Sequence, residues 1–224
     1  NYIYLCCLYF FYLKKREKSQ PFVKPAILKF ILYFTLFCIL DKFIHMKKIN
    51  HLKSGKRTIK IESKGLENLA NTLTSDFSKV CEKLLTTKGK IITLGVGKSG
   101  HVAKKISATL SSTGSPSSFI NAAEALHGDI GGINKKDKVI IFSHSGQSEE
   151  IINLIPFLKS IKCEFFSITG SEDSFIAKNS TINLNTGISE EACPLDLAPT
   201  TSTTASMALG DAIAVALLEA RDFK

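Results

Sequence analysis

The chain lacks the cysteine spacing that small secreted domains and zinc-bound domains depend on. Its 224 residues include six cysteines and no tryptophan, and no two cysteines form a CxxC pair. This spacing excludes a zinc finger and a disulfide framework, so we predict a reducing compartment, the cytoplasm. No pair of histidines or cysteines is spaced as a metal site, and we predict that no metal is required.

Acidic residues are scarce near the N-terminus. Residues 1–60 carry 13 Lys and Arg against 2 Asp and Glu, whereas residues 61–224 carry 16 against 18. The net charge of +9 therefore belongs to an N-terminal extension. A nucleic-acid groove would need that charge on the folded domain, so we predict no nucleic-acid partner.

Long hydrophobic runs are also missing from this extension. The apolar runs at residues 1–13 and 30–40 fall short of the roughly 20 residues that a membrane span needs. Widening the second run to residues 26–44 takes in charged residues, so a membrane role is not favoured, although a weak anchor stays an alternative. The first methionine is Met46, where the composition becomes that of a soluble domain. We predict that Met46 is the natural start of the protein and that residues 1–45 are translated upstream sequence outside the fold.

The remaining sequence predicts one α/β domain over residues 62–224, preceded by a basic flexible lead-in at residues 46–61. Apolar residues recur every three or four positions from residue 62 to 87, which predicts a long N-terminal helix. Short buried runs then predict strands, with helices between them, and this alternation predicts a doubly wound parallel sheet. The strands are expected at residues 91–94, 118–120, 139–142, 165–168 and 182–184, and the helices at 100–111, 149–161, 174–177 and 204–220.

The loop after the first predicted strand has the composition of an anion site. Residues 95–100 read Gly-Val-Gly-Lys-Ser-Gly and open a helix, where backbone amides can approach a phosphate. The run matches GxGxxG, but Asn121 ends the second strand where a dinucleotide site needs an acidic residue. Lys98 also argues against a dinucleotide site, because a neutral turn would not need a lysine at this position. A Walker loop fails because Ile92 stands in place of the first glycine. A tight turn with an exposed lysine is the alternative.

Two later loops are rich in hydroxyl groups. Residues 143–148, Ser-His-Ser-Gly-Gln-Ser, precede a predicted helix and could bind phosphate without adding charge, while N-capping by Ser148 is the alternative. Residues 200–204 precede the last helix and are a weak signal alone. His127 follows the second strand, and a lone histidine is more often a surface or core residue. The sequence contains no GxSxG motif, so it does not predict a serine hydrolase.

Four segments taken together resemble the sugar isomerase (SIS) domain of D-arabinose 5-phosphate isomerases. The similarity covers about residues 62–223, and its segments are residues 97–101, 124–129, 143–150 and 191–204. The resemblance implies a flavodoxin-like fold with a five-stranded parallel sheet, and homotetramers with active sites between subunits. It also implies interconversion of D-ribulose 5-phosphate and D-arabinose 5-phosphate, the first step toward the Kdo sugar of lipopolysaccharide.

The resemblance also implies the functional residues, and Lys98, His127, Glu150 and Glu191 are the expected catalytic positions. Isomerisation through an enediol needs a base and a group that stabilises the oxyanion, but no redox cofactor. We assign Glu150 as the base and Lys98 as the cation, while His127 opens the sugar ring or moves protons between oxygens. The expected substrate-binding residues are Gly97, Ser99, Gly114, Ser115, His127, Ser143, Ser145, Gln147, Ser148 and Thr203.

Three departures from the family pattern leave alternatives open. Asn121 stands where relatives commonly carry a histidine that binds inhibitory zinc, and Gln147 replaces a common acid. The family pattern also continues beyond Lys224 with a His-Pro-Gly-Gly segment whose histidine is counted as catalytic. A truncated isomerase or a non-catalytic phosphosugar-binding module is therefore the alternative, and a dinucleotide-dependent oxidoreductase is a third reading.

Overall fold

The computed structural model describes residue 34 and residues 49–221. It divides the chain into two units, residues 1–50 and residues 51–224. The predictions for residues 1–45 and for Met46 lie outside the described residues, apart from Phe34, which is helical and exposed. The second unit holds every predicted strand and every predicted site residue.

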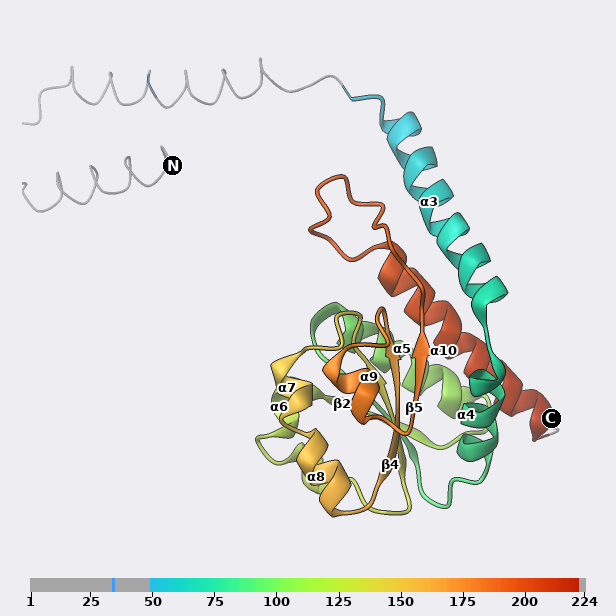
Figure 1. Ribbon diagram of the computed structural model, residues 1–224, viewed down its shortest axis with the longest axis vertical. Helices are drawn as coiled ribbons and strands as arrows, with labels where there is room; N and C mark the ends of the chain where they lie inside the picture. The colour runs from blue at the N-terminus through green and yellow to red at the C-terminus, as the bar shows by residue number, and fades with distance from the viewer. Residues whose placement is uncertain (1–33, 35–48, 222–224) are drawn as a thin grey trace, which may run out of the picture. The chain divides into compact units, whose positions relative to one another are not determined.

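A five-stranded parallel sheet forms the centre of this unit (Figure 1). All five predicted strands are confirmed, and each is longer than predicted by one or two residues. The spatial order is β2-β1-β3-β4-β5, the order of flavodoxin-like sheets, so the winding reverses between β1 and β3. The strands are β1 (Ile91–Gly95), β2 (Ser117–Asn121), β3 (Lys138–Phe142), β4 (Glu164–Thr169) and β5 (Ile182–Asn185).

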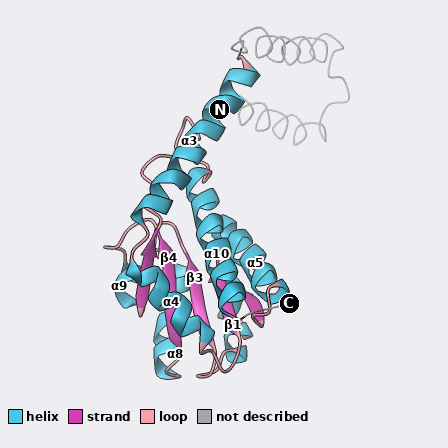
Figure 2. Ribbon diagram, turned by 90° about the vertical axis from the view of Figure 1, so that its right-hand side faces the viewer, coloured by secondary structure: helices cyan, strands magenta, loops and turns pink. Residues whose placement is uncertain are grey.

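Helices cover both faces of the sheet (Figure 2). Alternate strand residues enter two separate cores, which is why strands such as β3 are continuous apolar runs. One core is closed by α3 (His51–Thr72), α4 (Ser75–Leu85), α5 (Gly97–Ser112) and α10 (Thr201–Ala220). The other is closed by α6 (Ala122–Ala125), α7 (Glu149–Ile152), α8 (Ile155–Ser160) and α9 (Phe175–Asn179), beside a 3-10 turn at Asp129–Gly132.

The N-terminal helical region differs from the prediction in two ways. Residues 51–61, expected as a flexible lead-in, form the first three turns of α3. No proline interrupts this stretch, and each further helical residue adds a backbone hydrogen bond. The single helix predicted over residues 62–87 is instead two helices, because Thr74 starts α4 as its N-cap and accepts a hydrogen bond from the Asp76 amide (3.3 Å).

A second predicted helix is also divided. Residues 149–161 form α7 and α8, with Leu154 as the N-cap of α8. Pro156 lies in the first turn of α8. Proline has no amide hydrogen and its ring clashes with the carbonyl four residues earlier, so a helix can begin at Pro156 but cannot run through it.

The last helix is the most apolar in the described part of the chain. Among residues 34 and 49–221, only α10 is long and apolar enough to cross a membrane by length and composition, and half of that window is buried within the domain. A Cβ atom on Gly210 would lie 2.6 Å from the Ile106 side chain, so α5 and α10 pack closely at this glycine. The core therefore accounts for about half of this apolar window, including Leu209, Ile213 and Leu217.

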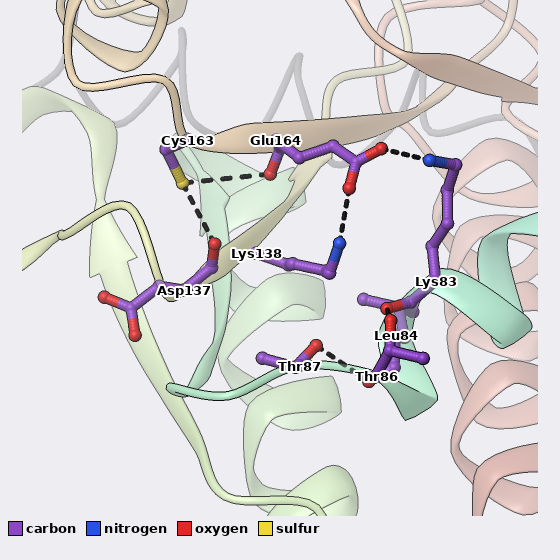
Figure 3. A network of polar contacts seen from close by, with 8 residues as sticks. All are labelled: Lys83, Leu84, Thr86, Thr87, Asp137, Lys138, Cys163 and Glu164. Atoms are coloured by element: carbon purple, nitrogen blue, oxygen red, sulfur yellow. Dashed lines mark hydrogen bonds and ion pairs between the residues drawn. The ribbon is translucent and has the colours of Figure 1, made fainter.

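A polar network stabilises the amino-terminal edge of the sheet (Figure 3). The Glu164 carboxylate accepts hydrogen bonds from Lys83 of α4 and Lys138 of β3. Burial raises the pKa of Glu164, but the two lysines outweigh it and lower the pKa below its usual value. Beside it, the Cys163 thiol donates to the Asp137 carbonyl (3.3 Å), and burial raises the pKa of Cys163 to about 11.

Glu164→Gln is expected to flatten the acid dependence of stability. A carboxyl group whose pKa is lowered on folding contributes stability above its unfolded pKa, and that contribution is lost as the pH falls through the folded pKa. At pH 7 the variant should lose at most about 1 kcal/mol of unfolding free energy relative to wild type, because solvent screens the partly exposed ion pairs of Glu164. Urea unfolding at pH 7 and pH 3 measures it. The exposed Glu172 serves as a control through Glu172→Gln, and an equal pH dependence in both variants would contradict the expectation.

Candidate active site

The segments that carry the predicted site residues begin at the carboxyl-terminal edge of the sheet, after four of its five strands. All five strands are parallel, so the segments that follow β1, β2, β3 and β5 start from the same edge. Gly95, the last residue of β1, pairs with Asn121 of β2 and Phe142 of β3, which brings the first three of these loops side by side. Most of the predicted site residues occupy these loops, next to the reversal of winding between β1 and β3.

The loop after β1 leaves backbone amides free at the start of α5. Its N-cap, Val96, supplies no side-chain cap, and the first amide that bonds back into the helix is that of Gly100, to the Val96 carbonyl (3.0 Å). Gly97 adopts a left-handed φ of +56°, and Gly100 packs directly on the end of β1. The amides of residues 97–99 therefore have no helical partner, which is the arrangement that binds anions.

The loop after β3 holds three serine hydroxyls. The Ser143 and Ser148 hydroxyls are hydrogen bonded to each other (3.1 Å), and the Ser145 hydroxyl accepts from the Gln147 amide (3.2 Å). Ser148 stands at the N-cap position of α7, but its side chain makes no capping hydrogen bond. The alternative of side-chain capping by Ser148 is therefore wrong, and the hydroxyl is paired within the loop.

Residues of the next loop, after β4, hold this serine loop in shape. Gly146 has a φ of +61°, and a Cβ atom there would lie 2.1 Å from the Ser174 hydroxyl. The Ile176 amide donates to the Gly146 carbonyl (3.0 Å), and the Gly170 amide donates to the His144 carbonyl (2.8 Å). Sequence analysis missed Gly170 and Ser174 because neither belongs to a motif, although both follow a predicted strand.

The segment after β2 places His127 beyond a short helix. Asn121 is the N-cap of α6, and its side chain accepts from the Ala123 amide (3.1 Å), so Asn121 has a capping role here. His127 is exposed and its amide donates to the Glu124 carbonyl (2.9 Å). Within residues 49–221 no three His, Cys, Asp or Glu side chains are grouped as a metal site.

The predicted catalytic residues divide into two kinds. Lys98, His127 and Glu150 are exposed, and their side chains form no hydrogen bond or ion pair within residues 49–221. Glu191 is half-buried, and its Oε2 accepts from the Thr200 amide (2.8 Å), the Thr200 hydroxyl (2.9 Å) and the Ser202 amide (3.3 Å). Only the first three side chains are therefore free to meet a ligand without breaking a contact.

Two predicted binding residues lie away from the others. Gly114 and Ser115 occupy the turn between the end of α5 and the start of β2, which is at the amino-terminal edge of the sheet. Ser115 is fully buried, and its hydroxyl has no partner within residues 49–221. Thr203, by contrast, lies in the first turn of α10 and donates to the Thr200 carbonyl (2.9 Å). Within one subunit Gly114 and Ser115 do not join the site.

Comparison with known proteins agrees with this arrangement of loops. The model of the SIS domain family matches residues 84–216. The chain is 48% identical over 177 residues to arabinose 5-phosphate isomerase KdsD of Pseudomonas aeruginosa, covering 79% of this chain and 54% of the relative. It is 46% identical over 171 residues to KdsD of Escherichia coli K12, covering 76% of this chain and 52% of that protein. The chain thus spans about half the length of these relatives.

A solved structure shows the same fold. The structure of the E. coli CFT073 protein c3406 in complex with arabinose 5-phosphate matches with a TM-score of 0.77 and 36% identity, covering 80% of this chain and 95% of that one. These similarities confirm the family that the four sequence segments predicted, and the chain belongs to the SIS domain family.

Proposed function

We propose that this protein is an aldose–ketose isomerase that interconverts D-ribulose 5-phosphate and D-arabinose 5-phosphate, a step toward Kdo. The observation that carries the proposal is the sequence identity of 45–48% to arabinose 5-phosphate isomerases, together with the solved relative in complex with arabinose 5-phosphate. These relatives favour an isomerase over a non-catalytic phosphosugar-binding module. The free amides of α5 and the serine loop follow adjacent strands, β1 and β3, where one phosphate could contact both.

The substrate phosphate binds to hydroxyls and amides rather than to a fixed cation. Ser143, Ser145 and Ser148 supply the hydroxyls, with Gln147 beside them, and Gly97 and Ser99 supply backbone amides. Hydroxyl and amide donors bind a phosphate through several short hydrogen bonds without burying a further charge. The chemistry is then left to the three free side chains.

Isomerisation moves one proton between C1 and C2 of the open-chain sugar. Glu150 removes the C2 proton of the aldose and returns it at C1, through an enediol in which the negative charge develops on oxygen. Lys98 stabilises that oxyanion, and His127 opens the sugar ring or transfers the proton between O1 and O2. Glu150 follows Ser148 by two residues, so phosphate bound to the serine loop would bring one end of the sugar toward this carboxylate.

We further propose a cytoplasmic homotetramer with active sites between subunits. Leu195 and Leu197, in the loop before α10, are 73% and 78% exposed, as surfaces that contact another copy often are. Gly114 lies at the opposite edge of the sheet and is half-buried, so it could reach substrate only in the site of a second copy, whereas Ser115 is fully buried within its own subunit. The cysteines described, Cys81, Cys163 and Cys193, are all free, which fits a reducing compartment.

An NMR assay of the full chain with D-arabinose 5-phosphate in deuterated buffer tests the function. We expect ketose to form and deuterium to enter at the exchanging carbons, because the base exchanges its proton with solvent between abstraction and return. D-Arabinose without phosphate is the control and should react far more slowly. A phosphosugar that raises the melting temperature but never exchanges would support a binding module instead.

A further inference from the structure

We infer that Glu191 is a positioning residue that holds the loop before α10 on the first turn of that helix. On this view it exchanges no proton with the substrate. The inference rests on the proposed function, since it changes the role that family resemblance implies for one residue of the same site.

The carboxylate takes the part that an N-cap side chain usually takes. Thr200 is the N-cap of α10, and its own side chain makes no capping hydrogen bond. Glu191 Oε2 instead accepts from the amides of Thr200 and Ser202 (2.8 and 3.3 Å) and from the Thr200 hydroxyl (2.9 Å). The two amides are backbone donors that have no partner within the helix, because they lie at its start. A carboxylate at this position also complements the helix dipole.

Two further hydrogen bonds, from the Ala192 amide, close the loop at residues 192–199. The Ala192 amide donates to the hydroxyls of Thr200 and Thr201 (2.9 and 3.1 Å). Glu191 and Ala192, at the start of the loop, are therefore both hydrogen bonded to the residues at its end. Leu195 and Leu197 within the loop are largely exposed, and little burial holds its tip in a single subunit. The Glu191 end is therefore the main attachment of the loop.

The charge of Glu191 also opposes a role as base. Burial raises the pKa of Glu191, but the polar groups of Ser202 and Thr200 outweigh it and lower the pKa below its usual value. A general base at neutral pH works best with a raised pKa. A carboxylate that already accepts three hydrogen bonds on one oxygen must break contacts to take a proton. Within residues 49–221, Glu150 has no such contacts.

The position of α10 gives this capping a function in the site. Both α5 and α10 begin at the carboxyl-terminal edge of the sheet, and both run away from it side by side (Figures 1 and 2). Ile106 packs against Gly210, and each lies nine residues after the first residue of its helix. The first turns, which carry Lys98 and Thr203, therefore lie at the same end of the helix pair. By fixing the start of α10, Glu191 sets where Thr203 stands relative to Lys98.

Three variants test the inference: Glu191→Gln, Glu191→Ala, and Glu190→Ala as a matched control at the exposed neighbouring glutamate. Gln keeps a carbonyl oxygen that can accept the same bonds, so it should keep kcat/KM within about tenfold of wild type, whereas Ala should lose about a hundredfold. The acid limb of the pH–rate profile should be the same in wild type and the Gln variant. If Gln loses as much activity as Ala, or loses the acid limb, the carboxylate takes part in proton transfer and the inference is overturned.

Hydrogen exchange gives a second readout that does not depend on turnover. In the Ala variant the amides of Thr200 and Ser202 should exchange at least about tenfold faster than in wild type, and in the Gln and Glu190→Ala variants they should stay protected. Unchanged protection in the Ala variant would overturn the inference. An absence of isomerase activity in the wild type would instead overturn the proposed function, and the exchange rates would still decide the role of Glu191. If the Ala variant does not fold, the Gln variant decides alone.

Discussion

Glu150→Gln is expected to abolish isomerase turnover while phosphosugar binding stays within a few-fold of wild type. The amide has nearly the shape of the carboxylate but cannot accept a proton, and loss of a general base typically lowers kcat by about 10²–10⁴-fold. Glu150 makes no hydrogen bond or ion pair within residues 49–221, so the change removes no structural contact there. Deuterium exchange measures proton abstraction, and calorimetry with D-arabinose 5-phosphate measures binding.

The adjacent glutamate provides the control. Glu149 is also exposed and lies in the same first turn of α7, so Glu149→Gln removes the same charge one residue away. We expect this variant to keep its turnover. Wild-type turnover in Glu150→Gln would show that another residue is the base, and an equal loss in both variants would point to the charge at the start of α7 rather than to proton transfer.

Gly146→Ala is expected to lower the free energy of unfolding by about 2–4 kcal/mol and to remove phosphosugar binding. The left-handed conformation at φ +61° alone costs a Cβ residue about 1–2 kcal/mol. The added Cβ atom would also lie 2.1 Å from the hydroxyl of the buried Ser174, so either the serine loop or the start of α9 must move. Urea unfolding measures the stability, and a phosphosugar-induced shift in melting temperature measures the binding.

Gly97→Ala separates the two causes. Gly97 also has a left-handed φ, +56°, but a Cβ atom there would meet nothing within 4 Å. This variant should lose only the conformational part, about 1–2 kcal/mol. The difference in the free energy of unfolding between the two variants is the cost of displacing Ser174. If both lose the same stability, the contact between the serine loop and α9 does not shape the site.

Some of the fold could be predicted because its signals are local. The run of apolar residues in β3 is buried on both faces of the sheet, so it stands out in the sequence without any knowledge of its neighbours. The helix predicted over residues 62–87 was wrong in its continuity, because Thr74 caps α4 without breaking the apolar periodicity. The break at Pro156 did have a local signal, since proline is compatible with the first turn of a helix but not its interior.

The sequence alone determined the family, the five strands and the loops that meet at one edge of the sheet. The motifs, the periodicity of apolar residues and the alternation of strands with helices are all local properties of the chain. The tertiary structure decided which side chains are free. It bound Glu191 to the start of α10, paired Ser148 with Ser143, placed Ser174 against Gly146, and left Ser115 at the far edge. Those contacts join segments whose spacing is set only by how helices and strands pack, so no pattern along the chain could reveal them.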